Sequence, residues 1–308
     1  MFSTGPTTGF PGKEVPSAIF VNTWGIIPMT RAAGRLRPLA YPTELLPVGT
    51  RFDGDVPRPR AVGEYLLERM VAGGATRICI VVPAGRSDLL DYYGGRSGDA
   101  EIVYAVQPEP AGYCDALFRG TAVIGPEDRV LTGRPRTIWF PEEGYNLLPD
   151  DVLSFLLFPS AQAEGAETVV TDEDGGVREI DLQRAQPGSS WIWSAVKLPG
   201  RSFHALHQLW IRRGRCDDEL GPLINAYLAC GGRAVGVRSG LACVDVGTLN
   251  GYREALQLLA GRGSAPTSPP LPESRSYTDG WQPLTAGDYA RHFPGQRLGA
   301  EALHRSNR

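Results

Sequence analysis

The sequence lacks the features that mark membrane, secreted and nucleic-acid-binding proteins. No stretch approaches the roughly 20 apolar residues of a membrane-spanning helix, and residues 1–17 lack the basic start and apolar core of a secretory signal. We therefore expect a cytoplasmic protein with no membrane partner. The net charge of -3 and pI near 5.9 give no overall attraction for nucleic acid, so we do not expect nucleic acid as a partner either.

Cysteine and histidine are also scarce. The 308 residues include 5 cysteines, none in a C-x-x-C pair, and Cys79 lies within the apolar run 77–82. Reduced, mostly buried thiols are expected rather than a disulfide framework. His204 and His207 lie three residues apart on an expected helix, but without a thiol or carboxylate at ligand spacing they do not predict a metal site.

Helical and strand patterns alternate along the first half of the chain. Apolar residues at helical spacing predict helices at 61–71, 87–93 and 113–123, and short apolar runs predict strands at 77–82, 101–106 and 137–140. Continuous apolar strands are typical of a parallel sheet covered on both faces. The alternation predicts an α/β fold with a doubly wound, mainly parallel mixed sheet and helices on both faces.

The second half is less regular, and the ends differ from the middle. We expect one main domain over 18–260, an irregular arm over 1–17, and a Pro/Ser-rich linker with a C-terminal tail over 261–308. The apolar segment 152–158 fits either a helix or a strand. The other expected elements are strands at 168–171, 177–182, 191–198 and 241–246, and helices at 202–213, 218–230 and 250–259.

Residues 24–49 carry the most informative motif. A strand runs into the loop MTRAAG, which is followed by RLRPL and then by LLPV. This order resembles the opening of sugar-1-phosphate nucleotidylyltransferases, where a glycine-containing loop ends in Thr/Ser-Arg-Leu-x-Pro-Leu and a Lys precedes Leu-Leu-Pro-Val. The resemblance implies that Arg35 contacts a triphosphate. It places Arg31 and Ala33 where the family has glycines, and Thr43 where it has the Lys.

Two later motifs extend the resemblance over roughly residues 18–260. The segment QPEPAG at 107–112 resembles the family's Gln-x-x-Pro-x-Gly loop, which implies that Gln107 and Gly112 contact a nucleobase. The segment CVDVGT at 243–248 resembles a strand end that carries Asp-Ile/Val-Gly-Thr, which implies that Asp245 helps to hold Mg²⁺. The resemblance also implies a nucleotidyltransferase-like, Rossmann-type fold and self-association into dimers or tetramers.

The family's second metal ligand is an Asp at the end of the central strand. Residues 137–143, TIWFPEE, match that strand best and put Glu142 in the Asp position. A different register takes Val130 and Leu131 as the strand and places Arg136 near that position. The Lys that grips the sugar phosphate in the family corresponds to Gln183 here.

These replacements predict weakened phosphate handling. Side chains at 31 and 33 crowd a loop whose backbone N–H groups would otherwise approach phosphates. A Lys about 4 Å from a phosphate oxygen gains on the order of 4 kcal/mol at an effective dielectric of about 20, so Thr43 and Gln183 each remove at most that much. If half of each contribution acts in the transition state, transfer slows roughly a thousandfold.

The leading hypothesis is a pseudoenzyme or repurposed protein that binds a nucleotide, sugar phosphate or other small anionic metabolite. Arg31 and Arg35 would line its anion pocket, and Arg35, Glu142 and Asp245 are the catalytic candidates if any reaction occurs. Two alternatives stay open. One is an active sugar-1-phosphate nucleotidylyltransferase with an altered phosphate loop, which would use Glu142 and Asp245 to hold Mg²⁺; no cofactor is expected otherwise. The other is a non-catalytic regulatory subunit of an active relative.

Overall fold

A computed structural model of the chain describes residues 21–29, 42–109, 111–160, 167–182 and 189–262. The described residues up to Gly261 form one compact unit, and Arg262 is assigned to a second. Arg31, Arg35 and Gln183 lie outside the described residues, as do the N-terminal arm and nearly all of the C-terminal tail.

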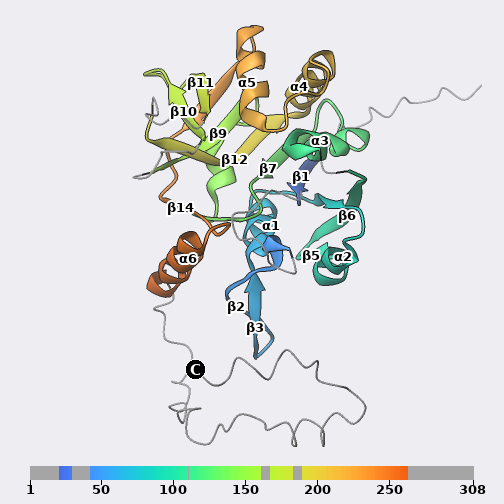
Figure 1. Ribbon diagram of the computed structural model, residues 1–308, viewed down its shortest axis with the longest axis vertical. Helices are drawn as coiled ribbons and strands as arrows, with labels where there is room; N and C mark the ends of the chain where they lie inside the picture. The colour runs from blue at the N-terminus through green and yellow to red at the C-terminus, as the bar shows by residue number, and fades with distance from the viewer. Residues whose placement is uncertain (1–20, 30–41, 110, 161–166, 183–188, 263–308) are drawn as a thin grey trace, which may run out of the picture. The chain divides into compact units, whose positions relative to one another are not determined.

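The main unit is built on a ten-stranded mixed sheet among the described residues (Figure 1). Its strand order is β11-β10-β12-β7-β1-β4-β6-β5. Off this path, β9 pairs with β12 and β13 pairs with β9. The strands are β1 (Thr23–Pro28), β4 (Arg77–Pro83), β5 (Arg96–Ser97), β6 (Ala100–Gln107), β7 (Arg129–Gly133), β9 (Leu153–Pro159), β10 (Glu167–Thr171), β11 (Val177–Leu182), β12 (Trp191–Pro199) and β13 (Ala234–Val237).

Helices cover both faces of this sheet. Ile26 and Ile27 of β1 are both fully buried and belong to different core clusters, because successive strand residues point to opposite faces. One cluster includes side chains of α3 (Gly112–Phe118), α4 (Gly200–Arg212) and α5 (Leu220–Ala229). The other includes α1 (Val62–Ala72) and α2 (Ser87–Tyr93). The predicted doubly wound α/β architecture is confirmed.

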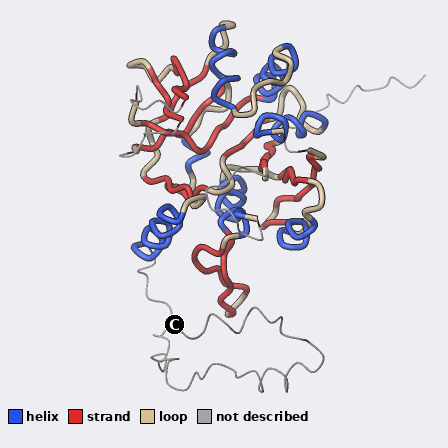
Figure 2. Tube along the Cα trace, viewed as in Figure 1, coloured by secondary structure: helices blue, strands red, loops and turns tan. Residues whose placement is uncertain are grey.

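Two short ribbons lie outside the main sheet. Strands β2 (Pro47–Asp53) and β3 (Val56–Ala61) form a hairpin that projects from the rest of the unit (Figure 2). Strands β8 (Thr137–Phe140) and β14 (Ala242–Asp245) form the second ribbon, and α6 (Leu249–Arg262) follows it. The remaining elements are three short turns of 3₁₀ helix, η1 (Thr43–Leu45), η2 (Arg119–Ala122) and η3 (Gly144–Leu147).

Most predicted elements are confirmed, and the ambiguous segment 152–158 is the strand β9. One assignment is wrong: residues 137–140 are a strand, as expected, but not the central one. All four residues of β8 are buried, as in a central strand, yet β8 pairs only with β14 among the described strands. Part of this burial comes from the cluster of Ile138 and Phe140 with Val62 and Tyr65 of α1. The strand beside β1 is β7.

Candidate functional site

Four neighbouring parallel strands, β7, β1, β4 and β6, end at one edge of the sheet. We call the strand ends at Gly133, Pro28, Pro83 and Gln107 the switch edge. From β1 the chain builds outward to β4 and β6, and then returns to place β7 on the other side of β1. Ligands of open α/β sheets bind outside the carboxyl ends of the strands at such a reversal of strand order. The switch edge is therefore the candidate site.

Arg134 directly follows β7 at the switch edge. Its backbone N–H donates to the Ser194 carbonyl (3.1 Å), and its carbonyl accepts bonds from the backbone N–H and hydroxyl of Thr137 (3.2 and 2.8 Å). The side chain donates through Nη2 to the buried Glu167 carboxylate, and its guanidinium lies 4.5 Å from the Trp193 ring centroid. This side chain is 36% exposed, so a cation is fixed in place while part of it faces solvent.

A second arginine lies beside Asp245. The Val246 N–H donates to the Arg136 carbonyl (3.0 Å), and the Asp245 carboxylate accepts a bond from the Gly247 N–H (2.8 Å). A side chain added at Gly247 would come within 3.0 Å of the Asp245 carboxylate and 3.4 Å of the Arg136 guanidinium. Both groups therefore flank the same turn, and Asp245 is next to a cation.

The end of β6 brings together the predicted Gln107 and Gly112. The Gln107 amide nitrogen donates to the Gly112 carbonyl (3.2 Å) and to the Asp115 carboxylate (2.8 Å). Gly112 has φ of +81°, and a Cβ there would lie 2.6 Å from the Asp218 carbonyl oxygen. Only glycine fits both the backbone conformation and the close approach. The proposed nucleobase contacts of Gln107 and Gly112 stay predictions.

Glu142 lies away from Asp245. In the β8–β14 ribbon Asp245 is opposite Thr137 and Ala242 is opposite Phe140, which puts Glu142 beyond the other end. Three residues of strand span about 10 Å. The structure therefore does not bring Glu142 and Asp245 together. Glu142 is exposed and lies within electrostatic range of the buried Arg69, whose pKa is lowered by burial to about 10 and partly restored by the Glu142 charge.

Comparisons with known proteins find similarity in structure. No family model and no curated protein sequence matches the chain. A Bacillus anthracis protein assigned as a glucose-1-phosphate thymidylyltransferase, solved with sucrose, matches with a TM-score of 0.64 at 21% identity, covering 77% of this chain and 94% of that one. UTP-bound UGPase from Acinetobacter baumannii matches with a TM-score of 0.61 at 15% identity, covering 80% and 95%. A UDP-glucose pyrophosphorylase solved with UDP-glucose matches with a TM-score of 0.62 at 15% identity, covering 79% of this chain and 100% of that one.

The chain has a nucleotidyltransferase-like fold. The matches support the predicted fold class, and none of the described helices is long and apolar enough to cross a bilayer. The strand next to β1 is β7, which contains Val130 and Leu131, and Arg134 is the residue that follows it.

The described residues of the switch edge do not fit the Mg²⁺ pair that the resemblance implies. Mg²⁺ takes oxygen ligands in a nearly octahedral arrangement, whereas a guanidinium offers only donors and a positive charge. Arg134 follows β7, Arg136 flanks Asp245, and Glu142 follows the end of β8 that lies away from Asp245. Among the described residues, no group of three or more His, Cys, Asp or Glu is arranged to hold a metal ion.

Sequence reasoning missed two charged groups, Arg134 and Glu44. Arg134 was missed because no acidic residue follows this strand at Gly133 or Arg134. The only indication of the strand in the sequence was the short apolar run Val130–Leu131. Glu44 follows Thr43 in η1 and is 6% exposed; burial raises the pKa of its carboxyl, while the charges of Arg136 and Arg86 oppose that rise. The signal for Glu44 was its position next to the residue that replaces the family's Lys.

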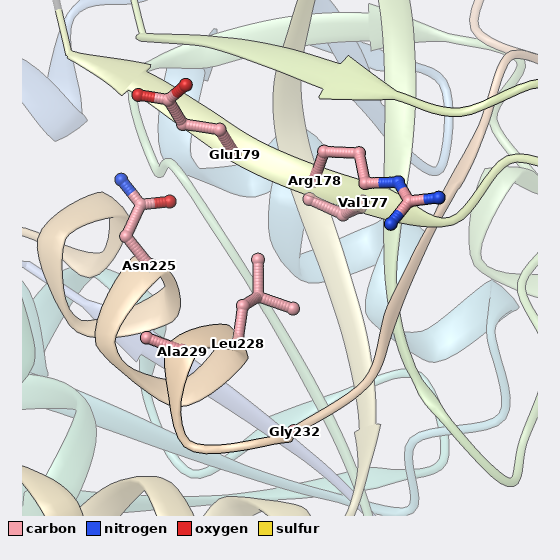
Figure 3. Close-up of a pocket in the computed structure, with 7 residues that line it drawn as sticks. All are labelled: Val177, Arg178, Glu179, Asn225, Leu228, Ala229 and Gly232. Carbon is pink, nitrogen blue, oxygen red and sulfur yellow. The ribbon is translucent and has the colours of Figure 1, made fainter.

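A separate pocket lies between β11 and α5 (Figure 3). Asn225 of α5 accepts a bond from the Ile180 N–H (2.7 Å) and donates one to its carbonyl (2.8 Å). Arg178 pairs with Asp172 at 3.1 Å. Because Asn225 satisfies the backbone of a sheet-edge strand, this pocket has a structural explanation and is not part of the switch edge.

Proposed function

We propose that the switch edge binds a nucleotide, sugar phosphate or other small anionic metabolite, and that Mg²⁺-dependent nucleotidyl transfer is weakened or lost. Arg134 is the observation that carries this proposal. A guanidinium at the end of β7, held by Glu167 and Trp193, supplies a fixed positive charge and a planar set of donors suited to phosphate. Fold neighbours solved with UTP or UDP-glucose support this ligand class.

The residues of this chain would bind by charge and orientation. The Arg134 Nη2 bond to Glu167 and the contact of its guanidinium with the Trp193 ring limit the rotation of this side chain, which is 36% exposed. The Arg134 guanidinium has five N–H donors, and among the described residues one of them donates a hydrogen bond, to Glu167. The others can donate to phosphate oxygens, and Arg136 adds a second cation nearby in sequence.

Calorimetric titration with sodium tripolyphosphate tests the proposal. We expect binding that changes less than about twofold between Mg²⁺ and EDTA, and that weakens by about 10-fold or more in Arg134→Gln, since a charge-assisted hydrogen bond contributes about 1.5–3 kcal/mol. Arg129→Gln is the matched control, because Arg129 starts the same strand and pairs with the exposed Asp150 at 3.1 Å. Equal binding by the two variants would contradict the proposal.

An active sugar-1-phosphate nucleotidylyltransferase is the second candidate, favoured by the retained Gln107, Gly112 and Asp245. Incubation with each nucleoside triphosphate, a panel of sugar 1-phosphates and Mg²⁺ separates the two candidates. Rapid pyrophosphate release that stops with EDTA would establish the active enzyme. We expect release near the level of a blank without protein.

A further inference from the structure

Arg69 of α1 is a buried cation in contact with three aromatic rings. Its guanidinium carbon lies 5.3 Å from the ring centroid of Tyr65, 4.9 Å from that of Trp139 and 5.2 Å from that of Phe140. The residue is 2% exposed. Burial lowers the pKa of Arg69 to about 10, so the side chain is still charged at neutral pH. Ring faces stabilise a cation, but they do not replace the hydrogen-bond acceptors that its N–H groups need.

One edge of this guanidinium has no acceptor. Nη1 donates to the Tyr65 carbonyl (2.8 Å), whereas Nε and Nη2 make no hydrogen bond within the structure as described. The buried indole Nε1 of the neighbouring Trp139 is unpaired as well. Native proteins leave few buried polar atoms unpaired, and a bound ion or water molecule is one explanation for those that remain. All three nitrogens are donors, so the missing partner is an acceptor.

Other arginines of the described chain show what fills the same edge. Nε and Nη2 together hold a carboxylate, at 2.7–3.2 Å, in the pairs Arg86–Asp88, Arg119–Asp115 and Arg213–Asp217. Arg69 offers the same pair of donors without a carboxylate in front of them. This edge of a guanidinium suits an anion that accepts two hydrogen bonds.

Two acidic residues lie within electrostatic range of Arg69, but neither is bonded to it. Glu68 forms an ion pair with Arg60. Glu142 is exposed and makes no hydrogen bond to Arg69 in the described structure. A buried charge without a bonded partner is costly, because nothing compensates for the water that it has lost. An anion from solution would supply both the opposite charge and the acceptor.

The enclosure of the site limits which anion fits. Arg69 is 2% exposed and Trp139 is 0% exposed, so an organic ligand such as a sugar phosphate has no open path to them. A divalent oxyanion is harder to strip of water than a monovalent ion, since the solvation energy grows with the square of the charge. A water molecule accepts hydrogen bonds but carries no charge to balance that of Arg69.

We infer that the Nε–Nη2 edge of Arg69, together with Trp139 Nε1, binds a small monovalent anion of the halide class, such as chloride. The bound ion would link α1 to β8, the strand that carries Trp139, and would stabilise the fold. The inference goes beyond the proposed function and does not rest on it, because Arg134 takes no part in this site.

Thermal unfolding of the full chain at constant ionic strength tests the inference. Sodium gluconate, whose anion is too large for an enclosed site, is replaced stepwise by sodium chloride. At a chloride concentration about ten times the dissociation constant, linkage should raise the midpoint of the native chain by about 3–5 °C. The rise should disappear in Arg69→Met, which removes the cation and its donors but keeps a long apolar side chain.

Two further variants locate the effect. Arg86→Met is the matched control, because Asp88 already fills the Nε–Nη2 edge of Arg86 at 2.9 Å, and it should keep the full rise. Arg134→Gln should keep it as well, which separates this site from the switch edge. No rise in the native chain, or an equal rise in Arg69→Met, overturns the inference and leaves water as the partner of Arg69.

Replacing buried charged groups with apolar ones is often neutral, so we expect Arg69→Met to fold. If it does not fold, crystals of the native chain grown with sodium bromide decide the question. An anomalous bromide peak beside Nε and Nη2 of Arg69 supports the inference, and its absence overturns it. Tripolyphosphate binding that depends on Arg134 would leave the proposed function standing in every case.

Discussion

The ends of β6 and β7 lie at the same edge of the sheet but are held by different kinds of contact. At β6, Gln107 is fixed by Gly112 and Asp115, both within eight residues. At β7, Arg134 is fixed by Glu167, 33 residues away, and by Trp193 on another strand. Local contacts therefore hold one half of the candidate site, and contacts between distant segments hold the other. The predictions below test that difference, from the largest expected effect to the smallest.

The largest effect is expected at Gly112. Gly112→Ala must adopt φ of +81° and place a Cβ 2.6 Å from the Asp218 carbonyl oxygen. Left-handed strain and overpacking together should lower the free energy of unfolding by about 3 kcal/mol. Urea denaturation measures this loss. It would show that the β6 end needs its glycine for folding as well as for any ligand contact.

The control for Gly112 is Gly85, which follows β4 at the same edge. Gly85 has φ of +79°, but a Cβ there would meet nothing within 4 Å. Gly85→Ala should therefore lose only the strain contribution, about 1–2 kcal/mol. Equal losses in the two variants would mean that contact with Asp218 does not matter.

The next effect concerns the ion pair that holds the β7 end. Glu167→Gln removes the charge facing Arg134 while Glu167 is only 5% exposed, so we expect a loss of about 1–2 kcal/mol in the free energy of unfolding. A double-mutant cycle with Arg134→Gln should give a coupling of about 1 kcal/mol. The exposed Arg58–Asp53 pair is the control, and Asp53→Asn should cost less than about 0.5 kcal/mol. If Glu167→Gln and Asp53→Asn lower the free energy of unfolding by similar amounts, Glu167 does not hold Arg134 in place.

The same contrast explains how much the sequence could predict. Helices and strands with clear periodicity were found, including α1 and β4, because their burial follows from the two faces of one sheet. The family resemblance singled out Gln107 and Gly112, and the structure joins them by a hydrogen bond of 3.2 Å, while their contacts with a ligand stay predictions. The position of β8 was not predicted, because a buried strand has the same apolar sequence whether it lies in the main sheet or in a ribbon covered by α1.

Arg134 and Glu142 show why the rest of the site was not predicted. An acid after a strand suggested a metal ligand, but which strand lies beside β1 depends on pairing that local residues do not encode. Arg134 is held by Glu167 and Trp193, and the spacing of these residues in the sequence does not indicate that they lie close to Arg134 in the fold.

A smaller effect is expected for Glu142. The carboxylate is exposed, so Glu142→Gln should change the free energy of unfolding by less than about 0.5 kcal/mol. Millimolar Mg²⁺ should leave the thermal midpoint of the native chain and of this variant unchanged, because Glu142 and Asp245 lie at opposite ends of the ribbon. Calorimetry with Mg²⁺ and EDTA measures both. An Mg²⁺-dependent rise in the native midpoint that disappears in Glu142→Gln would restore Glu142 as a metal ligand.

The smallest effect is a pH dependence at Glu44, next to the residue that replaces the family's Lys. Burial raises the pKa of this carboxyl, so the folded chain binds its proton more tightly than the unfolded chain does. The stability that comes from the protonated form is complete below the ordinary pKa of 4.5 and is lost as pH rises through the higher folded value. Glu44→Gln, which cannot ionise, should therefore be more stable than the native chain at pH 7, and the difference should shrink toward pH 4. Thermal midpoints over this range measure it. If the variant is instead less stable at pH 7, the nearby charges of Arg136 and Arg86 outweigh the burial of Glu44, and the carboxylate belongs with the β7 end as a counterion to its arginines.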